Sequence, residues 1–71
     1  MGELEHQIFK FLRNDKYVTT PELTRLLNNG KWDVEIYQQL RKKLNELLLD
    51  KKVEKLRVRT VNQWRLPKEV V

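Results

Sequence analysis

Residues 53–66 read VEKLRVRTVNQWRL, and this stretch decides the fold that the sequence predicts. Residues 53–58 and 62–66 alternate in side-chain character as β-strands do, and Arg59-Thr60-Val61 separates them. The pattern predicts a β-hairpin. Its connection contains neither glycine nor proline, so we expect a longer, open loop rather than a tight two-residue turn. Pro67 ends the second strand because proline has no backbone N–H to donate.

The first strand of this hairpin has no clean apolar face. Lys55 and Arg57 share one face with Val53, whereas Leu56 and Val58 share the other. Strand register is fixed most firmly where one whole face is apolar. We therefore expect the hairpin to bend or slip.

Upstream of the hairpin, apolar residues recur every three to four positions, which indicates helices. The longest helix has Asp33 as its N-cap and runs to about Asp50. Its expected core face consists of Ile36, Leu40, Leu44, Leu47 and Leu48.

A shorter helix precedes it, with Thr20 as the expected N-cap and Pro21 at the first helical position. It ends at Asn28-Asn29-Gly30, whose residues tolerate the left-handed backbone of a C-cap. The side chains expected in its core face are Leu23, Leu26 and Leu27.

The N-terminal helix begins near Leu4 and should end near Asn14-Asp15, and Tyr17-Val18-Thr19 is prone to form a short strand. The predicted order is helix, strand, helix, helix, strand, strand. No repeat or linker interrupts it, so residues 1–71 form a single α+β domain with its core in residues 4–66.

That order and several short motifs resemble the winged helix-turn-helix family. The resemblance covers residues 4–66 and lies in Ile8-Phe9-Lys10-Phe11-Leu12, in Val18-Thr19-Thr20-Pro21-Glu22-Leu23, and in Lys52-Val53 with Trp64-Arg65-Leu66. It implies three helices and a C-terminal hairpin wing. In this family the third helix usually enters the major groove while the wing touches the nucleic-acid backbone.

Thr19-Thr20 and Trp64-Arg65-Leu66 are also similar to the winged helices that bind Z-form nucleic acid. In that subfamily, an Asn and a Tyr on the third helix and a Pro-Pro pair before the Trp carry the contacts. The matching positions here are Arg41, Asn45 and Val61-Asn62, so only Trp64 is retained.

The positive charge of the chain lies in its C-terminal part. Basic and acidic residues balance within residues 1–30, so the whole net charge of +5 comes from Lys31 onward. Positive potential concentrated on one part of a small domain attracts polyanions. Nucleic acid is therefore the expected partner.

The face of the third helix that points away from its core carries side chains able to read bases. At 100° per residue, Gln38, Lys42 and Asn45 point most directly outward, and Arg41 flanks them. Gln and Asn can pair with adenine edges, and Arg or Lys with guanine. An ordinary solvated helix face is the alternative interpretation.

The hairpin supplies a second basic group, for which we predict contacts to phosphate: Lys55, Arg57, Arg59 and Arg65. The alternative is an edge strand that its charges protect from aggregation. We expect Trp64 in the core, with stacking on a base as the other interpretation. Trp32 and Tyr37 are candidate contacts to a partner, although Trp32 can also act as a hydrophobic staple before the N-cap.

The sequence excludes most catalytic chemistry. His6 is the only histidine, and cysteine and serine are absent, so no nucleophile-base pair, metal site or cofactor site is expected. A glycine-rich phosphate loop is also missing. No apolar run approaches the roughly 20 residues of a membrane span. The absence of cysteine suits a reducing compartment, cytoplasmic or nuclear.

The sequence thus predicts an isolated monomeric domain that is not an enzyme and binds double-stranded DNA, as in transcription or replication. The competing hypothesis is a protein-docking winged helix. Such domains include the C-terminal one in the large subunit of a general transcription initiation factor, which this chain resembles in Thr19-Thr20. They hold an acidic amphipathic peptide in a basic groove. Exposed aromatic residues clustered beside Arg41 and Lys42 would favour a peptide groove, and a flat polar face would favour DNA.

Overall fold

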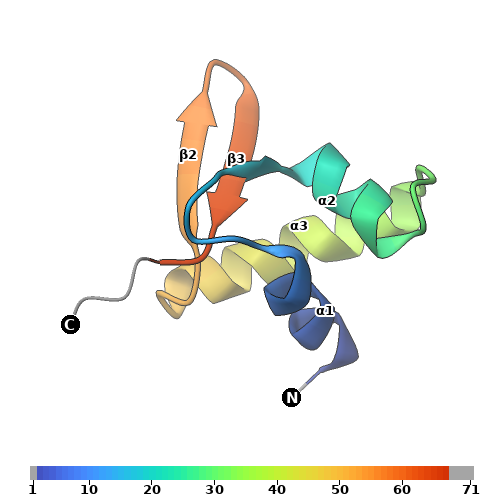
Figure 1. Ribbon diagram of the computed structural model, residues 1–71, viewed down its shortest axis with the longest axis horizontal. Coiled ribbons are helices and arrows are strands. Elements are labelled where there is room, and N and C mark those ends of the chain that lie inside the picture. The colour runs from blue at the N-terminus through green and yellow to red at the C-terminus, as the bar shows by residue number, and fades with distance from the viewer. Residues whose placement is uncertain (1, 68–71) are drawn as a thin grey trace.

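The computed structural model describes residues 2–67 and has an α+β fold consistent with a winged-helix arrangement. Three helices pack together, and a hairpin of two strands, called the wing below, projects beyond them (Figure 1). The strands form an antiparallel sheet in the order β1-β3-β2. In chain order the elements are α1 (Glu3–Phe11), β1 (Val18–Thr19), α2 (Thr20–Leu27), α3 (Val34–Leu49), β2 (Glu54–Val58) and β3 (Val61–Arg65).

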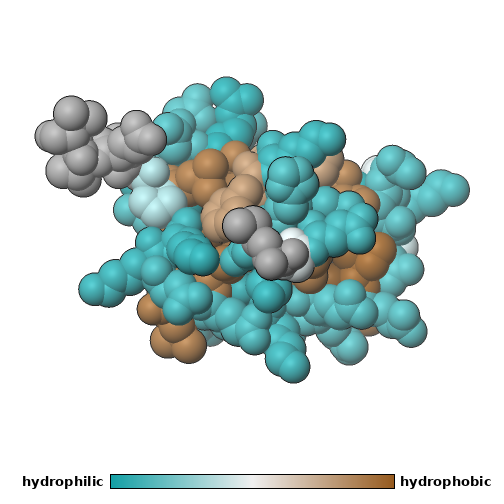
Figure 2. Space-filling model, turned by 90° about the horizontal axis from the view of Figure 1, so that it is seen from below, coloured by the Kyte–Doolittle hydropathy of each residue, from teal (hydrophilic) through white to brown (hydrophobic). Residues whose placement is uncertain are grey.

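The core lies where the three helices meet the base of the sheet. Trp64 is its largest side chain and is 1% exposed, which confirms the prediction for this residue. The other buried apolar side chains are Ile8, Leu12, Val18, Leu23, Leu40, Leu44, Leu47 and Val53. On the face seen from below, hydrophilic side chains cover most of the surface, and apolar areas show between them and at the lower left edge (Figure 2).

Helix α1 ends earlier than predicted, at Phe11 rather than near Asn14-Asp15. Leu12 has an extended backbone and is buried in the core. The carbonyl of Arg13 accepts a hydrogen bond from the backbone N–H of Leu66 at 2.7 Å. The chain leaves the helix because it runs beside the end of β3.

The N-cap of α2 is Thr19, one residue before the predicted position. Its side chain accepts a hydrogen bond from the backbone N–H of Glu22 at 3.2 Å. Thr20 is instead buried, and its Oγ1 accepts a hydrogen bond from Nε1 of Trp64 at 2.8 Å. This bond joins the start of α2 to β3.

The core face of α2 differs from the prediction at one position. Leu23 is buried, but Leu26 is 42% exposed and the fully buried neighbour is Thr24. The hydroxyl of Thr24 donates to the backbone carbonyl of Thr20 at 2.8 Å, so this polar side chain is satisfied without water. The buried face of α2 therefore contains Thr20 and Thr24 and leaves Leu26 outside it.

The predicted boundaries of α3 are correct. Asp33 is its N-cap and accepts a hydrogen bond from the backbone N–H of Ile36 at 3.0 Å. Asp50 is its C-cap. The loop before α3 contains Asn29 and Gly30, both with positive φ, as the sequence indicated.

The wing corrects the prediction of a long loop and a slipped register. Val58 lies directly opposite Val61, so only Arg59 and Thr60 connect the strands. Arg59 adopts the left-handed conformation, with φ 57°, that the tight connection requires. The ladder continues in regular register to Glu54 opposite Arg65. Most of the wing projects beyond the core, so its mixed faces need no bend to bury apolar residues.

We expect Thr20→Val to lower stability by about 1–3 kcal/mol, because it leaves the buried indole N–H of Trp64 without an acceptor. Thr24→Val is the matched control. It also removes the hydroxyl of a buried threonine. That hydroxyl donates to a backbone carbonyl of α2, so its loss leaves no buried side-chain N–H without an acceptor. Urea unfolding midpoints of the two variants measure the difference. Equal midpoints would contradict a structural role for the bond between Thr20 and Trp64.

Candidate nucleic-acid interface

A cleft of about 330 Å³ opens between α3, the first turn of α2 and the wing. Arg41 of α3 and Arg57 of β2 both line this α3–wing cleft. The other lining residues include no acidic side chain: Thr20, Pro21, Tyr37, Thr60, Val61 and Asn62. None of the ion pairs formed within residues 2–67 involves Arg41 or Arg57. The cleft therefore presents two unneutralised cations, an arrangement that attracts an anion.

The wing register places Arg57 in this cleft. Residues that lie directly opposite in a ladder share a face, so Arg57 is on the same face as Asn62, and Lys55 is on the same face as Trp64. Trp64 is buried, which identifies this face as the inner one. The bond from Trp64 to Thr20 then holds the inner face of the wing against α2.

Arg41 reaches the cleft from the exposed side of α3. Its guanidinium carbon lies 5.6 Å from the ring centroid of Tyr37. Contact with an aromatic ring satisfies the cation without using its N–H groups, which remain available to a carboxylate or phosphate. Arg41 therefore combines a favourable position with free hydrogen-bond donors.

Trp32 and Tyr37, the predicted partner contacts, lie against each other with ring centroids 5.0 Å apart. Trp32 is 48% exposed. The guanidinium carbon of Arg25 lies 5.8 Å from the Trp32 ring centroid, so an arginine adjoins each aromatic ring. Arg25, Trp32, Tyr37 and Arg41 form what we call the aromatic–arginine cluster. Arg25 was not predicted, because its contact depends on how the loop before α3 folds back.

The remaining predicted residues of α3 lie outside the cleft lining. Gln38, Lys42 and Asn45 are all exposed on the helix surface, as predicted. In the wing, Arg59 is exposed at the tip. Lys55 is exposed near the base, with Nζ 5.6 Å from the ring centroid of Trp64. These five side chains are exposed on α3 and the wing, and Lys55 lines a second depression rather than the α3–wing cleft.

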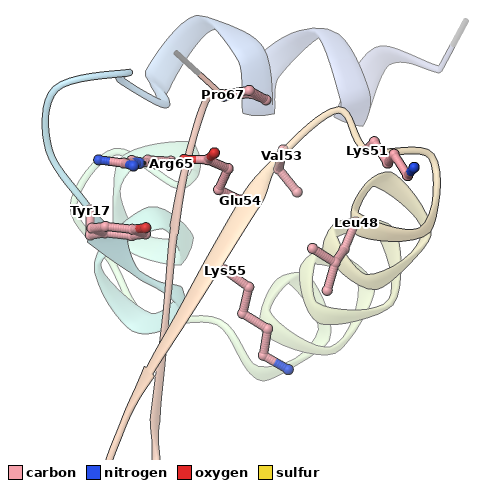
Figure 3. Close-up of a pocket in the computed structure, with 8 residues that line it drawn as sticks. All are labelled: Tyr17, Leu48, Lys51, Val53, Glu54, Lys55, Arg65 and Pro67. Carbon is pink, nitrogen blue, oxygen red and sulfur yellow. Dashed lines mark hydrogen bonds and ion pairs between the residues drawn. The ribbon is translucent and has the colours of Figure 1, made fainter.

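Arg65 lies outside the α3–wing cleft, in a second depression that Lys55 also lines. It is opposite Glu54 on the outer face of the wing, and its Nε donates to Oε1 of Glu54 at 2.6 Å. Figure 3 shows the two side chains pointing toward each other, with Tyr17 beside the guanidinium. That hydrogen bond raises the pKa of Arg65 above its usual value. The surrounding depression, of about 460 Å³, is larger than the α3–wing cleft. Lys51 and Lys55 also line it, but unlike the cleft it contains a carboxylate, that of Glu54, which neutralises its arginine.

Two polar residues that the wing contributes to the cleft were not predicted as site residues. Thr60 and Asn62 both line it, and the buried Oδ1 of Asn62 accepts no hydrogen bond from any other residue in the range 2–67. Their place follows from the two-residue loop of the wing, which fixes Asn62 opposite Arg57. A sequence pattern that leaves the loop length open cannot fix this pairing.

No family model, curated protein or solved structure matches the chain. Within residues 2–67, no three histidine, aspartate or glutamate side chains gather to hold a metal ion, and no helix has the length and apolar character needed to cross a membrane. The α3–wing cleft and the cluster beside it are thus the features from which a function can be argued.

Proposed function

We propose that the chain binds nucleic acid, with double-stranded DNA as its ligand, through α3 and the inner face of the wing. The observation that carries this proposal is the convergence of Arg41 and Arg57 in a cleft without acidic lining. Two elements that are distant in sequence each contribute one unpaired guanidinium. Guanidinium groups bind phosphate oxygens through paired N–H donors, so one phosphate group can engage both elements.

The dimensions of α3 fit the same ligand. Its 16 residues span about 24 Å at 1.5 Å per residue, and a B-DNA major groove is wide enough to admit a helix. Gln38, Lys42 and Asn45 are exposed along it and suit contacts to base edges. In this arrangement Arg57 and Arg59 of the wing contact the phosphate backbone, which positions the helix without reading sequence.

Removal of one charge from α3 and one from the wing tests the proposal. We expect Arg41→Gln and Arg57→Gln each to weaken binding to a fluorescein-labelled duplex about 5- to 150-fold, corresponding to about 1–3 kcal/mol. The matched control is Lys43→Gln. Lys43 lies two residues from Arg41 on the same helix, but its Nζ pairs with Oε2 of Glu46 at 3.4 Å. This control should keep the parent affinity when fluorescence anisotropy is measured.

Equal losses in all three variants would indicate a response to net charge alone and would contradict binding at the cleft. Undiminished duplex affinity in Arg41→Gln and Arg57→Gln would contradict the proposed function itself. Circular dichroism melting of each variant checks that the fold is kept.

A protein-docking function is the second candidate, and the aromatic–arginine cluster favours it. Trp32 and Tyr37 are apolar anchors beside Arg25 and Arg41. An acidic amphipathic helix could place apolar residues on the two rings and carboxylates on the two guanidiniums. Titration of a further variant, Trp32→Ala, with such a peptide and with the duplex separates the functions. Loss of peptide binding with unchanged duplex binding would assign the cluster to a protein partner.

A further inference from the structure

The outer edge of the wing is a strand without a neighbour. In the order β1-β3-β2, the strand β2 has β3 on one side and no other strand of the described chain on the second side. The opposite edge strand, β1, has only two residues, whereas β2 has five. A free edge of this length offers backbone N–H and C=O groups to an added strand.

The register identifies which backbone groups are free. Opposed pairs in an antiparallel ladder alternate between hydrogen-bonded and non-bonded types. The pair Val58 and Val61 closes a two-residue loop, and it must be a bonded pair, because the alternative would require bonds between the adjacent residues Arg59 and Thr60. Counting back, the backbone groups of Leu56 face β3, and those of Lys55 and Arg57 face outward.

The side chains along this edge differ on its two faces. Lys55 and Arg57 lie on the inner face, and both are exposed. On the outer face, Leu56, Val58 and Val61 are 40%, 46% and 42% exposed. Val61, which is next to the loop, also lines the α3–wing cleft. Scattered apolar residues on a surface are ordinary, but three that adjoin on one sheet face indicate a contact surface. Lys55 and Arg57 alone would be enough to protect the edge from aggregation. Protection from aggregation does not explain the exposed aliphatic side chains on the outer face.

A second copy of this chain is a poor occupant of the edge. Outward-facing groups must bond to outward-facing groups, so antiparallel pairing of two β2 strands brings Lys55 or Arg57 of one copy opposite Lys55 or Arg57 of the other. Like charges directly opposite each other destabilise a sheet. A strand with carboxylates on the face of Lys55 and Arg57 would instead bring opposite charges together, and it fits this edge.

We propose that β2 binds an extended protein segment in which acidic and apolar residues alternate, and that this segment pairs with the free edge as a fourth strand. Its carboxylates would lie beside Lys55 and Arg57 on the inner face. Its apolar side chains would extend the surface of Leu56, Val58 and Val61 on the outer face. The bound segment is extended and lies at the edge of β2, whereas the docking alternative above is a helix bound at the aromatic–arginine cluster. Binding at the β2 edge does not depend on nucleic-acid binding.

The probe is a nine-residue synthetic peptide in which glutamate alternates with valine, and the control peptide has the same composition in two blocks. Amide hydrogen exchange of the ¹⁵N-labelled chain is followed by NMR near pH 7. We expect the alternating peptide to slow exchange at the N–H groups of Lys55 and Arg57 by about tenfold or more at saturation. The N–H of Leu56, which already faces β3, should change much less.

Two variants test the two faces separately. Lys55→Gln with Arg57→Gln removes the charges, and Leu56→Thr with Val58→Thr removes aliphatic surface while placing threonine, which favours strands, at both positions. Each should weaken peptide binding at least fivefold, and a regular spectrum of each variant confirms that the wing is folded.

Three results would overturn the proposal. One is unchanged exchange at Lys55 and Arg57, and another is equal binding of the block peptide. The third is protection of the same amides that rises with protein concentration in the absence of peptide, which would assign the edge to a second copy.

Discussion

Trp64→Ala should lower the free energy of unfolding by about 3–5 kcal/mol, the largest single effect we expect in this chain. The indole is 1% exposed, lies in the strand that joins β1 to β2, and donates a hydrogen bond to Thr20. A domain of this size has a total stability of only about 4–11 kcal/mol. The variant should therefore be unfolded, or close to it, at physiological temperature.

The second tryptophan of the chain provides the control for this substitution. Trp32 is 48% exposed, so Trp32→Ala should change stability by about 0.5 kcal/mol or less. Thermal and urea unfolding of both variants, followed by circular dichroism, measure the contrast. A Trp64→Ala variant that unfolds at the parent midpoint but no longer binds nucleic acid would show that the ring acts on a ligand rather than in the core.

Salt should have the largest effect on binding. Arg41 and Arg57 line the cleft, and Lys42 of α3 and Lys55 and Arg59 of the wing are exposed on the same two elements. If three to six phosphates are neutralised, the logarithm of the association constant should fall with the logarithm of salt concentration with a slope of about −3 to −6. Between 50 and 200 mM salt the affinity should fall roughly 60- to 4,000-fold.

Anisotropy titrations of one duplex at four or more salt concentrations measure this slope. Arg57→Gln should reduce its magnitude by about one unit if the side chain contacts a phosphate. Lys43→Gln, whose amine is already paired with Glu46, should leave it unchanged. Affinity that is constant across these concentrations would contradict the electrostatic basis of the proposed function.

Local sequence signals were enough to predict the type and order of the elements. Helix α3 was predicted almost to the residue, because Asp33 is a side-chain N-cap and the apolar spacing is regular up to Asp50. The errors occurred where tertiary contacts decide the local structure. Helix α1 ends early because its continuation pairs with the end of β3, and the hydroxyl of Thr20 is used by Trp64 rather than by the helix terminus.

The site was predictable as a set of residues but not as an arrangement. Helical periodicity identified the exposed residues of α3, and the charge distribution identified the basic residues of the wing. No sequence pattern separates Arg57 from Arg65, because their faces depend on a wing register that a two-residue loop sets. The structure places Arg57 in a cleft with Arg41, and it places Arg65 beside Glu54 on the opposite face.

The left-handed residues at the ends of α3 and β2 couple folding stability to charge. Lys51 follows α3 with φ 59°, and Arg59 occupies the wing tip with φ 57°. Glycine adopts this conformation without the steric conflict that a Cβ atom creates. A protein engineer who relieved that conflict with glycine would also remove a positive charge at each position. At these two positions, therefore, selection for a more stable backbone and selection for a more positive surface act in opposite directions.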